Sequence, residues 1–207
     1  MDPRLDLLKE KWSSAIGGNC LDIGCNQGTV TMQTVLHFDI DSIVGVDIDR
    51  ALVKSAVFEM RMKQNQLDDL EGNQIDLFSK ISFRTEDYIH SPSNTKYNTI
   101  LCLSLTKWVH VQNGDEGIRL LFQKISEQLE EGGHLILEAQ PWKSYTRYKM
   151  DKAMVQKLTL QPTDFKAILE AHGLQLRFEG KPVKAHGGFK ERQLQVFQKT
   201  STPNNPT

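Results

Sequence analysis

Short apolar runs alternate with longer amphipathic stretches along most of the chain. Five such runs predict strands at residues 19–23, 43–47, 81–84, 98–105 and 134–138. Between them, apolar residues that recur three or four positions apart predict helices at residues 29–37, 50–64 and 115–129. Because a strand without polar alternation is covered on both faces, this order predicts a doubly wound parallel sheet with helices on each side.

The two ends of the chain differ from this middle part. Residues 2–12 show a loose helical spacing and predict an N-terminal helix. Residues 174–179 and 193–198 alternate apolar and polar residues, which predicts an antiparallel pair at one end of the sheet. We therefore expect an α/β fold with a seven-stranded, Rossmann-like sheet, mostly parallel with an antiparallel C-terminal pair. One domain is expected over residues 1–199, with a disordered tail at 200–207.

The segments between these elements carry weaker signals. Residues 65–80 are polar with few apolar positions and predict a surface loop. The helix at 115–129 is expected to stop at a pair of glycines, Gly132 and Gly133. The stretch before that helix is expected to be a loop, and it carries Lys107, Trp108 and His110.

Composition favours one folded domain. The chain has 207 residues, of which 39% are hydrophobic, enough for one buried core and short for two. No apolar run approaches the roughly 20 residues that cross a bilayer, and no signal-type segment follows Met1, so we expect a soluble intracellular protein. The three cysteines lie in or beside apolar runs without C-x-x-C spacing, which favours buried thiols over disulfides or metal ligands at Cys20, Cys25 and Cys102.

Charge is unevenly distributed, although the net charge is only −1. Residues 1–140 contain 13 Lys and Arg against 21 Asp and Glu, whereas residues 141–207 contain 12 against 5. A basic last third suits a polyanion that touches one face of the molecule, and a solvated basic surface without a partner is the alternative.

The stretch CLDIGCNQG, residues 20–28, predicts a strand that runs into a tight turn before a helix. Such a turn is expected to bring backbone N–H groups and the Asp22 carboxylate beside one ligand. A carboxylate at a strand end repels phosphate and suits an ammonium group, which S-adenosylmethionine carries together with a sulfonium and no phosphate. The stretch alone leaves a cofactor turn and a purely structural turn equally open.

Acidic residues follow the next strands as well. In open parallel sheets, ligands bind at the carboxyl ends of the strands where the strand order reverses. Asp47 can accept both hydroxyls of a ribose, with Asp49 as the competing candidate and a helix N-terminal acid as the alternative role. Asp87 can accept from an adenine amino group. The expected cofactor residues at these strand ends are Asp22, Gly24, Cys25, Asn26, Gly28, Asp47, Ile48, Asp87, Tyr88 and Leu103.

Five segments together resemble one family: CLDIGCNQG, IVGVDID, LCLSLTKWVH, NGDEG and LEAQPWKSY. Over about Asp2 to Lys199, the chain resembles the bicoid-interacting-type RNA methyltransferases, whose best-known members are the methylphosphate capping enzymes of small nuclear RNA. The first two segments alone indicate only a class I methyltransferase. LCLSLTKWVH with a downstream QPW is far more specific.

The resemblance implies a class I methyltransferase fold, S-adenosyl-L-methionine as the cofactor and an RNA 5′ end as the substrate, in the nucleus. It places Arg4, in the segment DPRL, at the methionine carboxylate of the cofactor. The tyrosine-rich part of the same family segment is absent here, so either the chain has been shortened or this member lacks part of a substrate clamp. We expect a monomer that needs no metal, with ribonucleoprotein components as candidate partners.

The family has two branches, which differ in the RNA end that they methylate. The capping branch acts on the γ-phosphate of a 5′-triphosphate, and the other branch acts on a 5′-monophosphate. Lys107 resembles the capping branch, because the second branch tends to carry an apolar residue there. Ala139, where a proline is usual, and Glu86-Asp87, in place of glycine-asparagine, depart from the capping pattern. A 5′-monophosphate methyltransferase and an RNA-binding module that keeps the cofactor fold are the alternative functions.

Methyl transfer to a phosphate needs no general base, because the second pKa of a phosphate monoester is about 6. Catalysis is then mainly a matter of holding the oxygen in line with the departing sulfur. Lys107 is expected to place the phosphate as a point charge, and His110 is either a second donor or a structural residue. Trp142 is the favoured stacking surface for the first base, with Trp108 as a second candidate. The expected substrate residues are Lys107, Trp108, Gln140, Trp142, Tyr145 and Arg147.

The basic last third supplies further candidates for the path of the RNA backbone, which should make binding weaken steeply with salt. They are Lys181, Lys184, Lys190 and Arg192.

Overall fold

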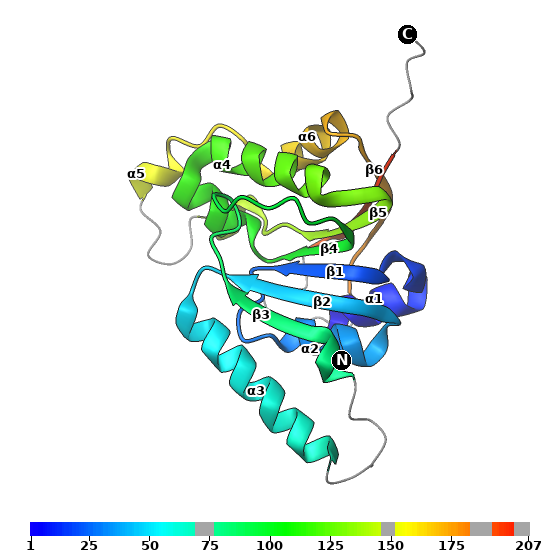
Figure 1. Ribbon diagram of the computed structural model, residues 1–207. Coiled ribbons are helices and arrows are strands. Elements are labelled where there is room, and N and C mark those ends of the chain that lie inside the picture. The colour runs from blue at the N-terminus through cyan, green and yellow to red at the C-terminus, as the bar shows by residue number, and fades with distance from the viewer. Residues whose placement is uncertain (69–76, 146–151, 183–191, 201–207) are drawn as a thin grey trace.

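The computed structural model describes residues 1–68, 77–145, 152–182 and 192–200, and a single seven-stranded sheet runs through it (Figure 1). The strand order is β3-β2-β1-β4-β5-β7-β6. The strands are β1 (Gly18–Ile23), β2 (Ile40–Asp47), β3 (Ile81–Thr85), β4 (Tyr97–Leu103), β5 (Leu129–Glu138), β6 (Leu174–Gly180) and β7 (Leu194–Lys199). The α-helices are α1 (Pro3–Lys11), α2 (Thr29–His37), α3 (Arg50–Asp68), α4 (Thr106–Gln128), α5 (Lys152–Val155) and α6 (Phe165–Ala171). Short 3-10 turns lie at Ser13–Ala15, Phe78–Lys80, Trp142–Ser144 and Pro162–Asp164.

Strand β1 lies at the reversal of the strand order. It pairs in parallel with β2 on one side and with β4 on the other. The chain first moves outward through β2 to β3 and then returns to the opposite side of β1 at β4. Strand β7 pairs antiparallel with both β5 and β6, which confirms the predicted antiparallel C-terminal pair. The reversal places the carboxyl ends of β1 and β4 side by side, where open sheets bind ligands.

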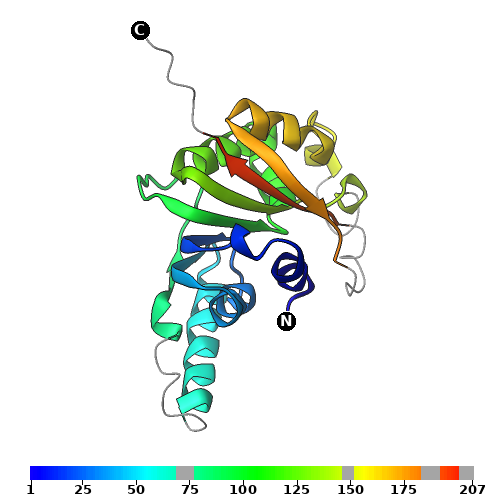
Figure 2. The same cartoon turned by 90° about the vertical axis from the view of Figure 1, so that its right-hand side faces the viewer.

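Helices cover both faces of the sheet, which explains why its strands are continuously apolar. Helices α1, α2 and α3 lie on one face, and α4 and α6 lie on the other (Figures 1 and 2). Along β4, Ile100 and Cys102 pack in the cluster that contains the α4 residue Phe122, whereas Leu101 and Leu103 pack in the cluster that contains α1. The side chains therefore alternate between two apolar layers.

The predicted loop before helix 115–129 is wrong, because α4 begins at Thr106 and includes Lys107, Trp108 and His110. The side chain of Gln140 stabilises this start: its Oε1 accepts from Thr106 Oγ1 at 3.2 Å and from the Lys107 backbone N at 3.1 Å. Gly114 is non-helical, with φ 67° and ψ −168°, and kinks the helix. The kink interrupts the apolar period, so the first turns resemble a loop in sequence.

The two glycines predicted to stop this helix lie inside a strand instead. Helix α4 ends at Gln128 and β5 starts at Leu129. Tyr97 is opposite Leu129 and Thr99 is opposite His134, so extra residues of β5, Gly132 and Gly133 among them, bulge from the pairing with β4. Helix α3 also runs to Asp68, beyond its predicted end, and shortens the expected loop at 65–80.

One further sequence expectation, on the cysteines, is confirmed. Cys20, Cys25 and Cys102 are buried free thiols, as predicted. Among the described residues, no helix has the length and apolar character needed to cross a membrane. Residues 201–207 of the expected tail lie outside the described part of the chain.

Gly28, which begins α2, should tolerate alanine poorly. Its φ is +74°, and a Cβ there would lie 2.5 Å from Phe83 Cζ and 3.0 Å from Ala56 Cβ. Gly132 is a matched control, because its φ is +76° and a Cβ would meet nothing within 4 Å. We expect Gly28→Ala to lower the free energy of unfolding by about 1 to 3 kcal/mol more than Gly132→Ala, as overpacking does. Chemical denaturation measures both, and equal losses would contradict the packing role of Gly28.

Candidate functional site

A cavity of about 730 Å³ opens at the carboxyl edge of the sheet, where the strand order reverses. It is lined by residues that follow β1, β2, β3 and β4, by Arg4 of α1 and by the first turns of α4. Of the predicted cofactor residues, those that line it are Arg4, Asp22, Gly24, Cys25, Asn26, Asp47, Ile48, Asp87, Tyr88 and Leu103. Gly28 does not line it and packs against Phe83, so its place is structural.

The lining of the cavity is strongly acidic. The acidic and basic side chains that line it are one guanidinium, from Arg4, and the carboxyl groups of Asp22, Asp47, Asp49, Glu86 and Asp87. Five carboxylates against one guanidinium repel an anion such as a nucleotide phosphate and attract a cation. The cavity therefore suits a positively charged ligand that carries hydroxyl or amino groups.

The turn after β1 does not offer backbone donors, contrary to the sequence expectation. The N–H groups of Gly24 and Cys25 both donate to Val46 O, at 2.8 and 3.0 Å. Asn26 N donates to Asp47 Oδ2 at 2.9 Å, and Gly28 N donates to Cys25 O at 2.9 Å. Because these amides already have partners within the protein, the turn forms no anion-binding nest.

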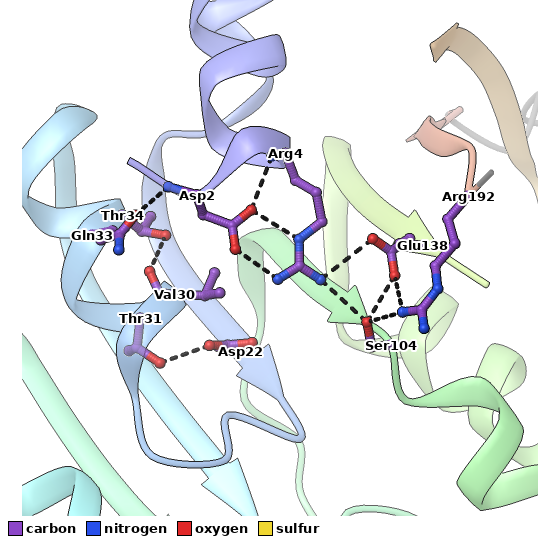
Figure 3. A network of polar contacts seen from close by, with 10 residues as sticks. All are labelled: Asp2, Arg4, Asp22, Val30, Thr31, Gln33, Thr34, Ser104, Glu138 and Arg192. Carbon is purple, nitrogen blue, oxygen red and sulfur yellow. Dashed lines mark hydrogen bonds and ion pairs between the residues drawn. The ribbon is translucent and has the colours of Figure 1, made fainter. Parts of the chain in front are cut away.

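Asp22 is the most deeply buried carboxylate of the cavity. Its Oδ2 accepts from Thr31 Oγ1 at 2.6 Å, and its side chain faces α2 (Figure 3). Burial raises the pKa of Asp22 to about 6, even though the hydrogen bond from Thr31 and the charge of Arg4 favour the carboxylate. A cation bound beside Asp22 would lower this pKa and stabilise the carboxylate.

The structure separates the roles of Asp47 and Asp49. Asp49 Oδ1 accepts from the backbone N of Ala51 at 2.7 Å, in the first turn of α3, so Asp49 is the helix N-terminal acid. Asp47 instead accepts from Asn26 N and Asp49 N, each at 2.9 Å, and faces the cavity. Ile48, between them, is 62% exposed and offers an apolar surface at the cavity.

The side chain of Asp87 makes its hydrogen bonds within its own turn. Its Oδ1 accepts from Ile89 N at 3.2 Å, and its Oδ2 lies 2.8 Å from His90 Nδ1. Burial opposes the carboxylate, but the hydrogen bonds from His90 prevail and hold the pKa of Asp87 below its usual value. Its predicted contact with adenine stays a prediction.

A network of ion pairs joins the cavity to the C-terminal strands (Figure 3). Arg4 donates to both carboxylate oxygens of Asp2, at 2.9 and 2.8 Å, and its Nη1 reaches Ser104 Oγ at 3.2 Å. Glu138, at the end of β5, is 2% exposed and lies 3.4 Å from Arg4 Nη1 and 2.9 Å from Arg192 Nη1. Arg4 therefore lines the cavity with its guanidinium already oriented by carboxylates.

Sequence reasoning did not single out Ser104 and Glu138, although they lie in the segments LCLSLTKWVH and LEAQPWKSY. Ser104 has φ 60°, which is uncommon for a residue other than glycine, and strained residues often mark functional sites. Glu138 is the last residue of its strand, and the strand-end rule used for the other strands points to it as well. Their partners, Arg4 and Arg192, lie near opposite ends of the chain, and no local pattern reveals that pairing.

His110 does not line the cavity, and of the two roles left open for it the contacts of its ring favour the structural one. The ring is fully buried, with Nδ1 at 3.2 Å from Tyr145 Oη and Nε2 at 2.8 Å from Asp115 Oδ1. Both ring nitrogens have protein partners, so His110 is a structural residue that joins α4 to the segment around Tyr145. Burial opposes the Asp115 carboxylate, but hydrogen bonds from Thr159 and His110 lower its pKa to about 2.

The other expected substrate residues divide into two groups. Gln140 and Tyr145 are buried, and Gln140 is occupied by the start of α4 and by Ser104 O, so neither presents a donor to the cavity. Trp142 is half-buried and stacks on Tyr145, with ring centroids 4.8 Å apart. Trp108 is 51% exposed and lines the cavity, whereas Trp142 does not line it.

Lys107 lies next to Trp108 on the first turn of α4, with its Nζ 4.6 Å from the centre of the Trp108 ring. Burial, and then the charge of Arg192, lower the pKa of Lys107. Lys107 stands beside the cavity rather than among its lining residues. Arg147 lies outside the described residues. Within the part of the chain that is described, no three His, Cys, Asp or Glu side chains group as metal ligands.

Similarity to known sequences points to one family. Residues 97–199 match the family described as Bicoid-interacting protein 3 (Bin3). The chain is 35% identical to a probable RNA methyltransferase of Arabidopsis thaliana, covering 96% of this chain and 74% of that protein. It is 31% identical to the U6 snRNA methylphosphate capping enzyme Amus of Drosophila melanogaster, covering 96% and 69%. An RNA 5′-monophosphate methyltransferase of Rattus norvegicus is 27% identical, covering 60% of this chain and 47% of its own length.

Solved structures agree with the fold. The N-methyltransferase NodS of Bradyrhizobium japonicum in complex with S-adenosyl-l-homocysteine gives a TM-score of 0.71 at 16% identity, covering 96% of this chain and 86% of that chain. The class I S-adenosylmethionine-dependent methyltransferase fold expected from the sequence is thereby confirmed.

Asp22 should make stability depend on pH in a defined window. Its folded-state pKa lies above the unfolded value of 3.8, so the native state binds the proton more tightly between about pH 4 and 6. The free energy of unfolding should therefore fall as pH rises through this window, relative to Asp22→Asn, by about 1.4 kcal/mol for each unit separating the two pKa values. Thr31→Val removes the hydrogen bond to the carboxylate and should widen the window. Chemical denaturation from pH 4 to 7 measures the effect, and a constant difference between wild type and Asp22→Asn would contradict it.

Proposed function

Because the chain belongs to the Bin3 family of RNA methyltransferases, we propose that it uses S-adenosyl-L-methionine to methylate the 5′-terminal γ-phosphate of a small non-coding RNA. The observation that carries the proposal is the share of this chain that aligns with each kind of relative. A methylphosphate capping enzyme aligns with 96% of this chain, whereas a 5′-monophosphate methyltransferase aligns with 60%.

The acidic lining of the cavity is consistent with S-adenosylmethionine as the cofactor. S-adenosylmethionine is a cation at its sulfonium and its ammonium, carries no phosphate, and fits a lining with five carboxylates. Asp22 would attract the ammonium, Asp47 would accept from the ribose hydroxyls, and Ile48 would cover the adenine ring. Arg4 would receive the methionine carboxylate. When bound, the cofactor supplies a methyl group that is activated by attachment to a positive sulfur.

In the described part of the chain, the α4 residues that line the cavity carry no general base, which is consistent with a phosphate acceptor; they are Trp108, Val109, Gln112 and Leu121. A phosphate oxygen is already an anion near neutral pH, so no proton has to be removed before it attacks. The protein must hold the oxygen in line with the methyl group, which is a matter of positioning. Buried His110 therefore has no proton transfer to perform and can serve the packing of α4.

Lys107 and Trp108 would receive the RNA end. Both stand on the first turn of α4, directly after β4, whose last residue Leu103 lines the cavity. The ammonium of Lys107 would hold a phosphate, and the exposed ring of Trp108 would stack on the first base. Location in the nucleus stays a prediction that rests on the family.

The substrate can be tested directly with labelled S-adenosylmethionine and one RNA prepared with either a 5′-triphosphate or a 5′-monophosphate. We expect transfer of the label to the triphosphate form. Transfer to the monophosphate form only would support the second branch of the family and contradict the proposal. Binding of the cofactor without transfer to either RNA would favour an RNA-binding module.

Lys107→Ala should reduce methyl transfer to triphosphate RNA by roughly 10 to 100 fold, because a hydrogen bond to a charged group contributes about 1.5 to 3 kcal/mol. The affinity for S-adenosylhomocysteine should stay unchanged, since Lys107 does not line the cavity. Lys54→Ala on the exposed surface of α3 is the matched control and should behave as wild type. Weakened product binding with normal turnover at saturation would refute the role of Lys107.

A further inference from the structure

Arg192 is held close to the end of β4 by half-buried Ser104 and buried Glu138. It lies just before β7, and its Nη1 donates to Ser104 Oγ at 2.8 Å and to Glu138 Oε1 at 2.9 Å. Glu138 accepts from Arg4 at a longer distance, 3.4 Å, so the stronger contact of this carboxylate is with Arg192. The Arg192 side chain is 17% exposed, which leaves part of it accessible from solvent. Glu138 thus orients a guanidinium at the border of the cavity.

Lys107 and Arg192 converge on the same corner of the sheet edge. The backbone N of Lys107 donates to Gln140 Oε1, and Gln140 Nε2 donates to Ser104 O. Ser104 Oγ in turn accepts from Arg192. The backbone of Lys107 and the guanidinium of Arg192 are therefore linked through Gln140 and Ser104, although they come from α4 and from the segment just before the last strand.

The charge of this corner is opposite to that of the rest of the cavity. Arg4, Lys107 and Arg192 supply three positive charges, against the carboxylates of Asp2 and Glu138. The lining after β1, β2 and β3 carries carboxylates instead. Among the described residues around the cavity, those at the corner where β4 and β5 end favour an anion.

Two cations match a phosphate chain better than a single phosphate. A phosphate monoester carries about −1.5 to −2 charge near neutral pH, and each added phosphate contributes further negative charge. Lys107 can hold one phosphate as a point charge, whereas the planar fork of an arginine binds phosphate oxygens in pairs. A guanidinium fixed beside Lys107 would therefore bind a longer phosphate chain more tightly than a single phosphate.

We propose that Arg192, oriented by Glu138 and Ser104, contacts phosphate oxygens beside Lys107 and thereby selects RNA ends that carry more than one phosphate. This inference rests on the proposed function, because it names the group at that site which reads the length of the phosphate chain. Arg192 binds the substrate, and Glu138 is a positioning residue that acts through Arg192.

The test compares binding of one fluorescent RNA with a 5′-triphosphate or a 5′-monophosphate, in the presence of S-adenosylhomocysteine. We expect Arg192→Met to weaken binding of the triphosphate form by roughly 10 to 100 fold, as loss of a charged hydrogen bond does, and that of the monophosphate form by less than about threefold. Arg192→Lys keeps the charge without the fork and should recover part of the preference. A loss of equal size for both RNAs, or an unchanged preference, overturns the inference.

A second variant covers the case in which Arg192→Met does not fold, because removing the arginine weakens the pairing of a buried carboxylate. Arg192→Met with Glu138→Gln removes both charges and should show the same loss of preference with native melting behaviour. Glu138→Gln alone should give an intermediate loss, since Arg192 is present but less well oriented.

Two outcomes separate this inference from the proposed function. If the wild type methylates triphosphate RNA while these variants still prefer to bind the triphosphate form, the role of Arg192 fails and the proposed function stands. If wild type methylates neither RNA, the proposed function fails, whereas a binding preference lost in the variants would still support Arg192.

Discussion

The buried carboxylate of Glu138 holds together parts of the chain that are far apart in sequence. It meets Arg4 of α1, Ser104 after β4 and Arg192 before β7, and each of these contacts lies at the carboxyl edge of the sheet (Figure 3). A buried anion is costly unless it is paired, so loss of one arginine would leave this carboxylate undercompensated. The positions of the side chains where the cavity meets the corner after β4 and β5 depend on that pairing.

The same edge of the sheet separates two kinds of charge. Carboxylates surround the part of the cavity that follows β1, β2 and β3, while the corner after β4 and β5 gathers lysine and arginine. The turn after β1 adds no amide donors that would blur this division, because its N–H groups are bonded within the protein. A cationic methyl donor and an anionic acceptor would each be attracted to its own side, and the transferred methyl group would lie at the border between them.

Much of this arrangement follows from local sequence, and the remainder depends on distant contacts. The apolar runs predict the sheet because helices cover it on both sides, and the strand-end rule places Asp22, Asp47 and Asp87 at one cavity. The start of α4 could not be predicted, since Gln140 satisfies it from 33 residues away. The burial of His110 likewise depends on its contacts with Asp115 and Tyr145, which a single tryptophan-valine-histidine segment does not reveal.

The central claim is that the acidic part of the cavity and the basic corner after β4 and β5 bring a methyl donor and a terminal phosphate together. Mass spectrometry of the 5′-terminal nucleotide, released from triphosphate RNA after reaction with the wild-type protein and S-adenosylmethionine, tests it most directly. The account predicts one methyl group on the outermost phosphate and none on the base or ribose. A methyl group on the ribose or the base, with the phosphates unmodified, would contradict it.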